Sequence, residues 1–474
     1  MNVDVILDDL DNNPQCLHGP CLLFKTNGPK AKEYYACSAS RDHKECPFYV
    51  DATDKNLKKL KKVSKWVAIR SETIQNIISK NPYKKYLKFL KLMKTCKNEN
   101  KCGERRKAEK CNQKLSVGYC YTCEELFESS DSDKHKDCKT IQNLTEYDLR
   151  HPTEILTPKE DSKTHAQYFF TNDTVKNIVL VLSRLGMERI LCIGAPRIHE
   201  YVLNECKDEF QSMLLDIDLK YYNFYSEKEF IWYNMFNNCV LKEGCLKNLE
   251  EFLSHEKVAV VMDPPFGGRV EPLAFTVNEL IRLYNRKNRM NENDGEGLEK
   301  SLGILWIFPY FMEVHIKASL PDFRMFDLKI DYDNHSSFTN VGNRKRKFGS
   351  PVRIFTNIPL SQLNLEGISG YRFCGSCGYW VAEENKHCDD CDACTSKNGR
   401  TYIHCYLCSR CVKPSYVHCR TCNKCILPDH TCSKPEKELS CFHCKGLGHK
   451  KRDCPEAQEM LTENRRKRRK KKRN

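Results

Sequence analysis

Between residues 139 and 373, the hydrophobic positions follow two different spacings along the chain. Short apolar runs of strand length occur at residues 188–194, 213–219, 257–262 and 302–308. Between them lie stretches such as "TVKNIVLVLSRLG", whose apolar spacing predicts an amphipathic helix that ends at Gly186. Strands that alternate with helices predict a doubly wound α/β sheet.

The end of this block is rich in strand-forming residues. "MFDLKIDYDNHSSF" and "SPVRIFTNI" flank a basic loop, "NRKRKFG". We expect the two segments to close the sheet as an antiparallel hairpin. Residues 141–368 are therefore predicted to form one Rossmann-like α/β domain, a strand plan that many nucleotide-binding folds share.

Two flanking regions are strongly basic. Residues 53–115 are rich in lysine with scattered apolar positions and predict basic helices and a linker, which are either a solvated surface or an RNA contact. Residues 457–474 end in "RRKRRKKKRN", which supplies nine positive charges toward a net charge of +15. We expect a solvated tail there, which can also serve as a nuclear address and a phosphate-binding arm. No apolar run approaches the roughly 20 residues that span a bilayer, so no membrane partner is expected.

The chain contains 29 cysteines, and most of them lie outside the α/β block. The sequence "MNVDVILDDLDNNPQ" is acidic and lacks the basic start and apolar core of a secretory signal, so we expect metal thiolates rather than disulfides. Residues 139–373 hold four cysteines, at spacings that suggest no metal site: Cys192, Cys206, Cys239 and Cys245.

The segment "CFHCKGLGHKKRDC", within residues 439–456, has the spacing of a zinc knuckle. Its ligands would be Cys441, Cys444, His449 and Cys454, and its two glycines allow the tight turns that so short a loop needs. Zinc knuckles are modules of proteins that bind single-stranded RNA.

A dense cysteine and histidine cluster occupies residues 369–435. Thiolates packed so closely repel one another unless metal neutralises them, so several structural zinc ions are expected. The candidate ligands are Cys374, Cys377, His387, Cys388, Cys391, Cys394, His404, Cys405, Cys408, Cys411, His418, Cys419, Cys422, Cys425, His430 and Cys432. If all sixteen act, they make four tetrahedral sites, whose pairing the spacing leaves open. The ending "DHTC" resembles the motif of palmitoyltransferases, but Thr431 replaces a histidine and there are no membrane spans, so acyl transfer is rejected.

Two further metal sites are predicted before the α/β block. Residues 1–52 resemble the GRF-type zinc finger of nucleic-acid enzymes, with Cys21 and His43 as spare candidates and Cys21 expected to be a packed thiol. Residues 116–140 resemble a two-Cys two-His finger that has a cysteine as its last ligand. The ligands of the first finger would be Cys16, His18, Cys37 and Cys46, and those of the second would be Cys120, Cys123, His135 and Cys138.

Ligands of an open α/β sheet bind beyond the carboxyl ends of its strands. Gly194 follows the first strand at such a turn, although an ordinary strand-to-helix turn explains it equally well. The second strand ends in Asp216 and Asp218, which could accept hydrogen bonds from ribose hydroxyls, with a surface acid as the alternative for one of them.

The fourth strand ends in "DPPF", which comprises Asp263, Pro264, Pro265 and Phe266. This sequence resembles the [DNS]-P-P-[YFW] motif of S-adenosylmethionine enzymes that methylate a nitrogen conjugated to a π system. The Asp263 carboxylate and the Pro264 carbonyl could accept both hydrogens of an adenine amine, and Phe266 could stack on the flipped base. Glutamine methyltransferases share the motif but typically carry NPPY, so Asp and Phe favour adenine.

The order of these segments along the chain resembles the CCHC zinc-knuckle rRNA N6-adenosine methyltransferase family. The resemblance covers both fingers, "IGAPR", "LLDID", "DPPFGG", the Cys/His cluster and the knuckle. It implies a Rossmann-like S-adenosylmethionine-dependent sheet flanked by small zinc modules, and methylation of one adenosine in large-subunit rRNA. It also implies a cofactor site made by Gln167, Tyr168, Phe169, Phe170, Gly194, Arg197, Asp218, Asn234, Met235 and Asp263.

The family resemblance also implies partners and a location. RNA, as a structured rRNA segment, and pre-ribosomal particles are the expected partners, and the nucleus and nucleolus the expected compartments, with the cytoplasm as a second location. The alternative hypothesis is a zinc-rich RNA-binding ribosome-assembly factor with an inactive methyltransferase fold. The complete "DPPF" speaks against that alternative, whereas the departure of "LCIGAPRIHE" from a Gly-rich cofactor loop leaves it open.

Overall fold

The computed structural model of the protein describes residues 3–27, 31–40, 46–55, 57, 65–99, 117–156, 168–289, 301–334 and 350–432. Two compact units make up the chain. The first extends to Glu383 and includes Lys397–Gly399, and the second contains Glu384–Ser396 and the residues from Arg400 onward. Gln167, His43, the predicted knuckle and the basic tail lie outside the described residues.

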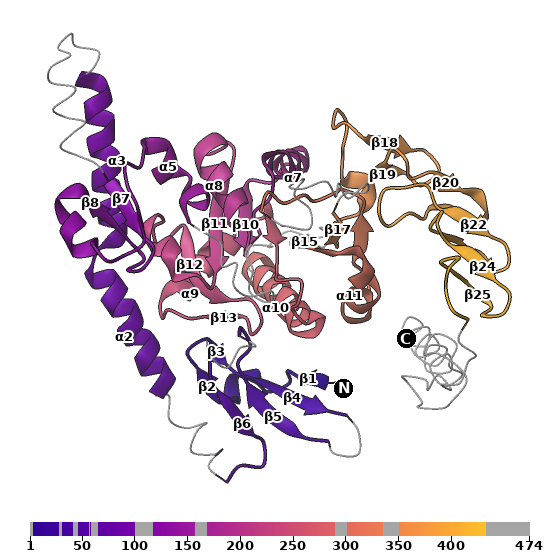
Figure 1. The fold of residues 1–474 in the computed structure, drawn as a ribbon, viewed down its shortest axis with the longest axis horizontal. Helices are drawn as coiled ribbons and strands as arrows, with labels where there is room; N and C mark the ends of the chain where they lie inside the picture. Colours follow the sequence, from indigo (N-terminus) through magenta and orange to yellow (C-terminus); the bar gives the residue numbers. More distant parts are fainter. Residues whose placement is uncertain are drawn as a thin grey trace. The chain divides into compact units, whose positions relative to one another are not determined.

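An eight-stranded sheet forms the centre of the first unit (Figure 1). Its strand order is β13-β12-β11-β10-β14-β15-β17-β16. The strands are β10 (Arg189–Ile193), β11 (Gln211–Asp216), β12 (Phe230–Asn234), β13 (Cys239–Val240), β14 (Val258–Met262), β15 (Gly303–Pro309), β16 (Arg324–Phe326) and β17 (Val352–Thr356). The five strands from β12 to β15 are parallel, and the strand order reverses at β10. This confirms the predicted doubly wound sheet and places a crevice beyond the carboxyl ends of β10 and β14.

The antiparallel closure of the sheet is also confirmed. β17 lies between β15 and β16 and runs antiparallel to both. Of the segment 325–338 that was expected to be a strand, residues 325–334 are described, and in this part the chain leaves the sheet after Phe326. Asp331 and Asp333 instead pair with the segment Phe169–Thr171, through N–H···O distances of 3.0 and 2.9 Å. Backbone groups that leave a sheet need other partners, and here they find them in a segment distant in sequence.

Helices cover both faces of this sheet (Figure 1). In β10, Ile190 and Cys192 face the core under one helical layer, whereas Leu191 and Ile193 face the core under the other. The strand is buried on both sides, as the apolar run predicts for a parallel sheet. The first layer contains α7 (Asn172–Arg184) and α8 (Pro196–Glu205), and the second contains α9 (Cys245–Leu253), α10 (Val270–Arg289) and α11 (Glu313–Ser319).

Local sequence signals fix the ends of these helices. The Thr171 side chain accepts a hydrogen bond from the N–H of Thr174 and caps α7. Gly186 follows α7 with a φ of +68°, as predicted for the end of that helix. Pro196 begins α8, where its missing N–H costs nothing because the first turn has no acceptor for it.

The N-terminal residues form a small antiparallel sheet of order β1-β4-β5-β6, with a separate β2-β3 hairpin. Two helices follow, as predicted, and their apolar positions pack: Phe89 is fully buried, and the Tyr86 ring meets that of Phe224. The elements are β1 (Val3–Ile6), β2 (Gln15–Cys16), β3 (Gly19–Pro20), β4 (Leu22–Thr26), β5 (Glu33–Ala36), β6 (Tyr49–Asp51), α2 (Lys65–Ser79) and α3 (Pro82–Glu99). Apolar residues of α2 and α3 are therefore part of the core of the first unit.

Small elements complete the two units. The second finger contains a three-stranded sheet of order β8-β7-β9, and a capping box between Thr145 and Asp148 starts the helix behind it. The remaining elements of the first unit are β7 (Val117–Cys120), β8 (Glu125–Glu128), β9 (Thr140–Ile141), α5 (Glu146–Arg150), α6 (Pro152–Ile155), β18 (Tyr371–Cys374) and β19 (Tyr379–Ala382). The second unit is a series of hairpins: β20 (His387–Cys388) with β21 (Ala393–Cys394), β22 (Ile403–Cys405) with β23 (Arg410–Val412), and β24 (Val417–Cys419) with β25 (Lys424–Ile426). Within the described ranges, no helix has the length and hydrophobicity needed to cross a membrane.

Candidate active site and metal centres

The turns after β10 and β14 meet at Gly194 and Asp263. Each turn is tied to a neighbouring strand, because the Gly194 N–H donates to the Leu215 oxygen and the Asp263 N–H donates to the Ile193 oxygen, both at 3.0 Å. Gly194 has a φ of +63°, and a Cβ there would lie 3.0 Å from the main-chain oxygen of Asp263 and 2.8 Å from Met235 Cε. Glycine is required at this position for both conformation and space.

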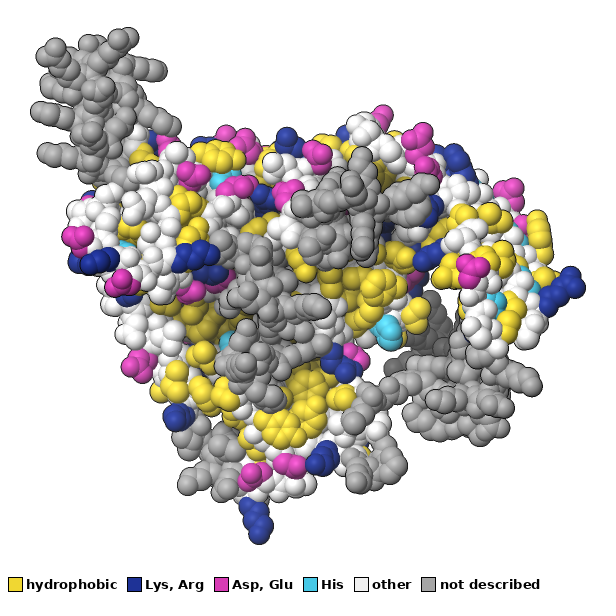
Figure 2. Space-filling model, viewed as in Figure 1, with side chains coloured by type: hydrophobic (Ala, Val, Ile, Leu, Met, Phe, Trp, Pro, Cys, Tyr) yellow, Lys and Arg dark blue, Asp and Glu magenta, His cyan; other side chains and the backbone are white. Residues whose placement is uncertain are grey.

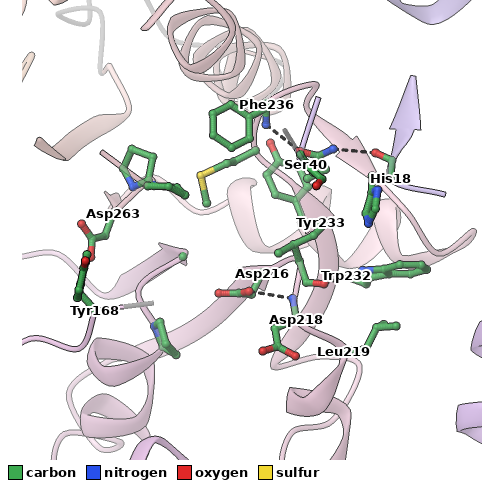
Figure 3. Close-up of a pocket in the computed structure, with 18 of the residues that line it drawn as sticks. His18, Ser40, Tyr168, Asp216, Asp218, Leu219, Trp232, Tyr233, Phe236 and Asp263 are labelled. Atoms are coloured by element: carbon green, nitrogen blue, oxygen red, sulfur yellow. Dashed lines mark hydrogen bonds between the residues drawn. The ribbon is translucent and has the colours of Figure 1, made fainter. Parts of the chain in front are cut away.

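A cavity of about 320 Å³ opens beyond these strand ends (Figure 3). Most of the predicted cofactor and catalytic residues line it: Tyr168, Phe169, Gly194, Asp216, Asp218, Asn234, Met235, Asp263, Pro264, Pro265 and Phe266. Phe170 and Arg197 are predicted site residues that lie outside the lining.

Arg197 and Phe170 lie outside the cavity lining and contact the segment that forms part of it. The buried Arg197 guanidinium donates to the Phe170 carbonyl at 2.8 Å and forms ion pairs with Glu154 and Asp333. These bonds hold together the segments around Phe170 and Asp333, one of which carries Tyr168 and Phe169 into the cavity. Arg197 therefore positions the aromatic segment rather than facing the cavity.

Two acids lie at the end of β11, where the sequence predicted ribose contacts. Asp216 is buried, and desolvation together with the neighbouring charge of Asp218 raises its pKa to about 7. One Asp216 oxygen accepts from the Asp218 N–H at 2.9 Å (Figure 3). Asp218 also forms an ion pair of 3.0 Å with Lys220. Both acids line the cavity, so neither is a surface acid.

Asp263 is partly buried at the tip of β14, where it lines the cavity. Its Oδ1 atom accepts a hydrogen bond of 2.9 Å from the Tyr332 hydroxyl. Burial raises the pKa of Asp263 well above the ordinary carboxyl range, and the Tyr332 bond opposes part of that rise. Tyr332 was missed by sequence reasoning, because it sits in an irregular segment and only its pairing with Phe170 aims it at Asp263.

Aromatic rings surround the "DPPF" turn. The Phe266 ring centroid lies 6.2 Å from that of Tyr168, with an angle of 28° between the planes, and 5.8 Å from that of Tyr332 at 75°. The three rings form an aromatic wall next to Asp263, on which a planar group could stack. In Figure 3, Tyr168 lies next to Asp263 at one side of the cavity.

Part of the cavity wall comes from the N-terminal zinc fingers. Leu17, His18, Ala39 and Ser40 of the first finger line it, and so does Glu124 of the second. Asn234 and Asn237, at the end of β12, donate to the His18 main-chain oxygen at 2.7 and 3.0 Å. No motif in the sequence indicated this wall, because it depends on packing between distant segments.

The predicted ligands of both N-terminal fingers converge. Cys16, His18, Cys37 and Cys46 form one group, Cys120, Cys123, His135 and Cys138 form another, and in each group the ligand atoms lie within 4.8 Å of one another. The Cys123 and Cys138 sulfurs are 3.9 Å apart, and Cys37 Sγ is 3.3 Å from His18 Nδ1. A tetrahedral ion with bonds of about 2.0–2.3 Å requires such separations, whereas a disulfide needs about 2.05 Å between sulfurs. Both groups therefore fit zinc, and Cys21 is a buried thiol beside the first group, as expected.

In the second unit, the ligand groups interleave. The structure brings together Cys388, Cys391, His404 and Cys411, then Cys405, Cys408, His418 and Cys425, and then Cys419, Cys422, His430 and Cys432. Adjacent residues of one strand thus serve neighbouring groups, as His404 and Cys405 do in β22. This assigns the pairing that the spacing left open.

The remaining predicted ligands are located as follows. Cys374 ends β18 and Cys377 precedes β19 in the first unit, and in the second unit His387 and Cys394 pair across β20 and β21. Cys441, Cys444, His449 and Cys454 of the knuckle lie outside the described residues.

Comparisons with known proteins agree with this geometry. The family described as probable N6-adenine methyltransferase matches residues 161–347, and the zinc knuckle family matches residues 439–456. The human rRNA N(6)-adenosine-methyltransferase ZCCHC4 is 40% identical over 467 residues, which cover 96% of this chain and 85% of the human protein. The mouse protein of the same name is 40% identical over 93% of this chain and 82% of its own length. The Xenopus tropicalis protein is 38% identical, over 94% and 87% respectively.

Proposed function

This chain belongs to the family of rRNA N6-adenosine methyltransferases, and we propose that it methylates one adenosine of large-subunit rRNA with S-adenosylmethionine as the methyl donor. The observation that carries the proposal is the meeting of Asp263 with Gly194 at the mouth of an acidic, partly aromatic cavity. We propose that this cavity holds the cofactor and that the target adenine enters beside the "DPPF" turn.

The cavity has the chemistry that this cofactor requires. When bound, S-adenosylmethionine supplies an electrophilic methyl group on a positively charged sulfonium. The carboxyl groups of Asp216, Asp218 and Asp263 line the cavity, and a bound cation would favour their ionised forms. Asp216 and Asp218 would accept from ribose hydroxyls, while Gly194 leaves room for close approach of the cofactor.

Asp263 and Pro264 would act on the adenine amine. The lone pair of an exocyclic amine is delocalised into the ring, which makes the nitrogen a poor nucleophile. The Asp263 carboxylate and the Pro264 carbonyl oxygen would accept the two amine hydrogens and turn the lone pair toward the methyl group. Tyr332 holds one carboxylate oxygen, so the other is the one offered to the amine.

Aromatic side chains would hold the flipped base. Phe266 and Tyr168 form an aromatic wall of the cavity that also contains Asp263. A base that has left its stack loses stacking energy, and contacts with such rings compensate for part of that loss.

We further propose that the cysteine and histidine groups bind zinc, and that the protein acts on rRNA within pre-ribosomal particles. The proposed compartments are the nucleus and nucleolus, with the cytoplasm as a second location. The basic residues 465–473 support this part of the proposal, because such a run can serve as a nuclear address and a phosphate-binding arm.

The test is methyl transfer from labelled S-adenosylmethionine to large-subunit rRNA, with the wild-type protein compared with Asp263→Ala. We expect the variant to lose transfer while it keeps its affinity for S-adenosylhomocysteine and for RNA. Equal transfer by both proteins would refute the role of Asp263, and absence of transfer by the wild type to any rRNA would refute the proposed reaction.

A further inference from the structure

Three aromatic side chains form a row across the outer face of the N-terminal sheet. Phe24 on β4 stacks on Tyr34 of β5, with ring centroids 5.4 Å apart and an interplanar angle of 20°. Tyr34 in turn stacks on Tyr49 of β6, with centroids 5.0 Å apart at 27°. We call Phe24, Tyr34 and Tyr49 the aromatic row.

The row lies on the side of the sheet that the finger core does not use. Residues alternate between the faces of a strand, and Leu23 and Tyr35 point into the core around the metal ligands. An antiparallel sheet of this kind usually presents polar side chains on its other face. Here that face carries aromatic rings, and Tyr49 is 48% exposed. Figure 2 shows hydrophobic side chains gathered over β4 and β5.

A groove connects the aromatic row with the active site. It has a volume of about 70 Å³ and is lined by Leu22 and Phe24 on the side of the finger and by Pro265 and Gly267–Arg269 on the side of the "DPPF" loop. Pro265 also lines the large cavity, as do Ala39 and Phe236. The surface is therefore continuous from Asp263, through the groove, to Phe24 and the rest of the row.

We propose that the groove and the aromatic row bind unpaired nucleotides next to the target adenosine, by stacking of their bases. This inference rests on the proposed function, because the continuity with the cavity matters only if an adenine enters there. Bases of any sequence stack on aromatic rings, and Arg269 in the groove wall offers a guanidinium to a phosphate. The occupant is single-stranded RNA, because duplex bases already stack on one another.

The experiment measures the affinity of the full-length protein for a short oligouridine that contains one adenosine, with S-adenosylhomocysteine present. We expect Tyr49→Ala to weaken binding by roughly 5- to 100-fold, the range for loss of one stacked base. Tyr49→Phe keeps the ring and should bind as the wild type does. Annealing the RNA to its complement should abolish the difference between Tyr49→Ala and the wild type.

Tyr147→Ala is the matched control, because Tyr147 is an exposed tyrosine of α5 that lines neither the groove nor the cavity. Zinc content and affinity for S-adenosylhomocysteine report whether each variant is folded, and Tyr49→Leu, which keeps an apolar side chain without a ring, replaces Tyr49→Ala if that variant unfolds. Equal affinity of the ring-less variant and the wild type, or an equal loss in Tyr147→Ala, would overturn the proposal. So would failure of the wild type to bind this RNA.

A parallel methylation assay separates this inference from the proposed function. If the wild type methylates rRNA and the ring-less variant has an unchanged KM, the aromatic row has no role and the function stands. If the wild type transfers no methyl group but loss of the ring still weakens RNA binding, the row is an RNA site and the proposed reaction fails.

Discussion

The side-chain amide of Asn234 donates a hydrogen bond of 2.7 Å to the main-chain oxygen of His18, a predicted zinc ligand of the first finger. The same amide nitrogen reaches Ser38 Oγ at 2.7 Å, and Asn234 Oδ1 accepts from the Phe236 N–H. The amide nitrogen of this buried side chain thus joins β12 to the finger, while its oxygen holds the turn after β12. Asn234 therefore shapes the cofactor cavity by holding a zinc module against it.

Asn234→Ala should weaken the binding of S-adenosylhomocysteine. Loss of the amide leaves the Phe236 N–H without its acceptor and leaves the His18 oxygen with the longer bond from Asn237. Such a loss costs about 1–3 kcal/mol, which corresponds to roughly a 5- to 100-fold increase in Kd if the finger wall moves away. Calorimetry measures this Kd. Asn248→Ala is the control, because the Asn248 amide donates to a main-chain oxygen in an exposed contact outside the cavity. Unchanged affinity in Asn234→Ala would show that the wall does not depend on this contact.

Gly194→Ala should abolish cofactor binding and methyl transfer together. The new Cβ would approach the main-chain oxygen of Asp263 to 3.0 Å and Met235 Cε to 2.8 Å. The turns after β10 and β14 would therefore have to separate. Gly186→Ala is the control: its φ of +68° imposes a similar strain of about 1 kcal/mol, but a Cβ there meets open space. Both variants should lose thermal stability, and only Gly194→Ala should lose affinity for S-adenosylhomocysteine. Similar affinities of the two variants for S-adenosylhomocysteine would show that the lack of room for a Cβ at Gly194 does not matter.

The central sheet and the position of "DPPF" could be predicted, because both follow from local pattern. A Val-rich run that stops at Asp263 identifies a strand and its carboxyl end without any tertiary information. The same holds for Gly194, whose place after an apolar run fixes it at the same edge of the sheet. The central strands, and the site residues that lie at their carboxyl ends, could therefore be predicted from the sequence.

The contacts between distant segments could not be predicted. Tyr332 is 69 residues from Asp263, and His18 is 216 residues from Asn234, so no periodicity links them. The metal ligands of the second unit show a different limit. Their "C-x2-C" spacings are alike, so every hairpin has several equivalent partners, and only the folded backbone brings His404 to Cys388 and Cys391.

The raised pKa of the Asp263 carboxyl predicts that methyl transfer rises with pH. The ionised carboxylate is the stronger acceptor for the amine, but burial raises its pKa, so the rate should increase as pH rises above the ordinary carboxyl range of about 4 toward the raised pKa. Asp263→Asn should be slower and should lose this pH dependence. A wild-type rate that is independent of pH across this window would contradict the prediction.

Asp263→Asn should raise the free energy of unfolding, although it lowers the rate of methyl transfer. A carboxyl whose pKa is raised by folding contributes stability below its unfolded pKa, and that contribution is lost as pH rises toward the folded pKa. Asp263→Asn carries no charge, so its free energy of unfolding should exceed that of the wild type by a margin that grows with pH, by up to about 1.4 kcal/mol per pH unit. Denaturant unfolding at several pH values measures this margin, and a constant margin would indicate that Asp263 ionises normally.

Tyr332→Phe should lower kcat and leave cofactor affinity unchanged. The Tyr332 hydroxyl donates to Asp263, and a hydrogen bond to a charged group contributes about 1.5–3 kcal/mol, so we expect a roughly 10- to 100-fold loss of kcat. The pKa of Asp263 should rise further, which shifts the pH–rate curve to higher pH. Tyr284→Phe is the control, because its buried hydroxyl donates to the Glu256 oxygen outside the cavity. An unshifted pH–rate curve would show that Tyr332 has only a packing role.

The second unit should lose its metal ions cooperatively. Among its described residues, Cys425 is the one buried hydrophobic side chain, so metal binding rather than an apolar core supplies its folding free energy. His404 and Cys405 of β22 serve two neighbouring ligand groups, and so do His418 and Cys419 of β24. Loss of one ion therefore disturbs the strand that holds a ligand of the next.

His404→Ala should accordingly release more than one zinc ion per chain, whereas His430→Ala, in the last group of the described series, should release one. Elemental analysis of the purified full-length proteins measures the difference, with the wild type expected to hold at least about five ions, one for each tetrahedral group that the two fingers and the interleaved series provide. Native mass spectrometry distinguishes partial loss in all molecules from complete loss in some. If both variants release a single ion, each site folds independently and the interleaving has no energetic consequence.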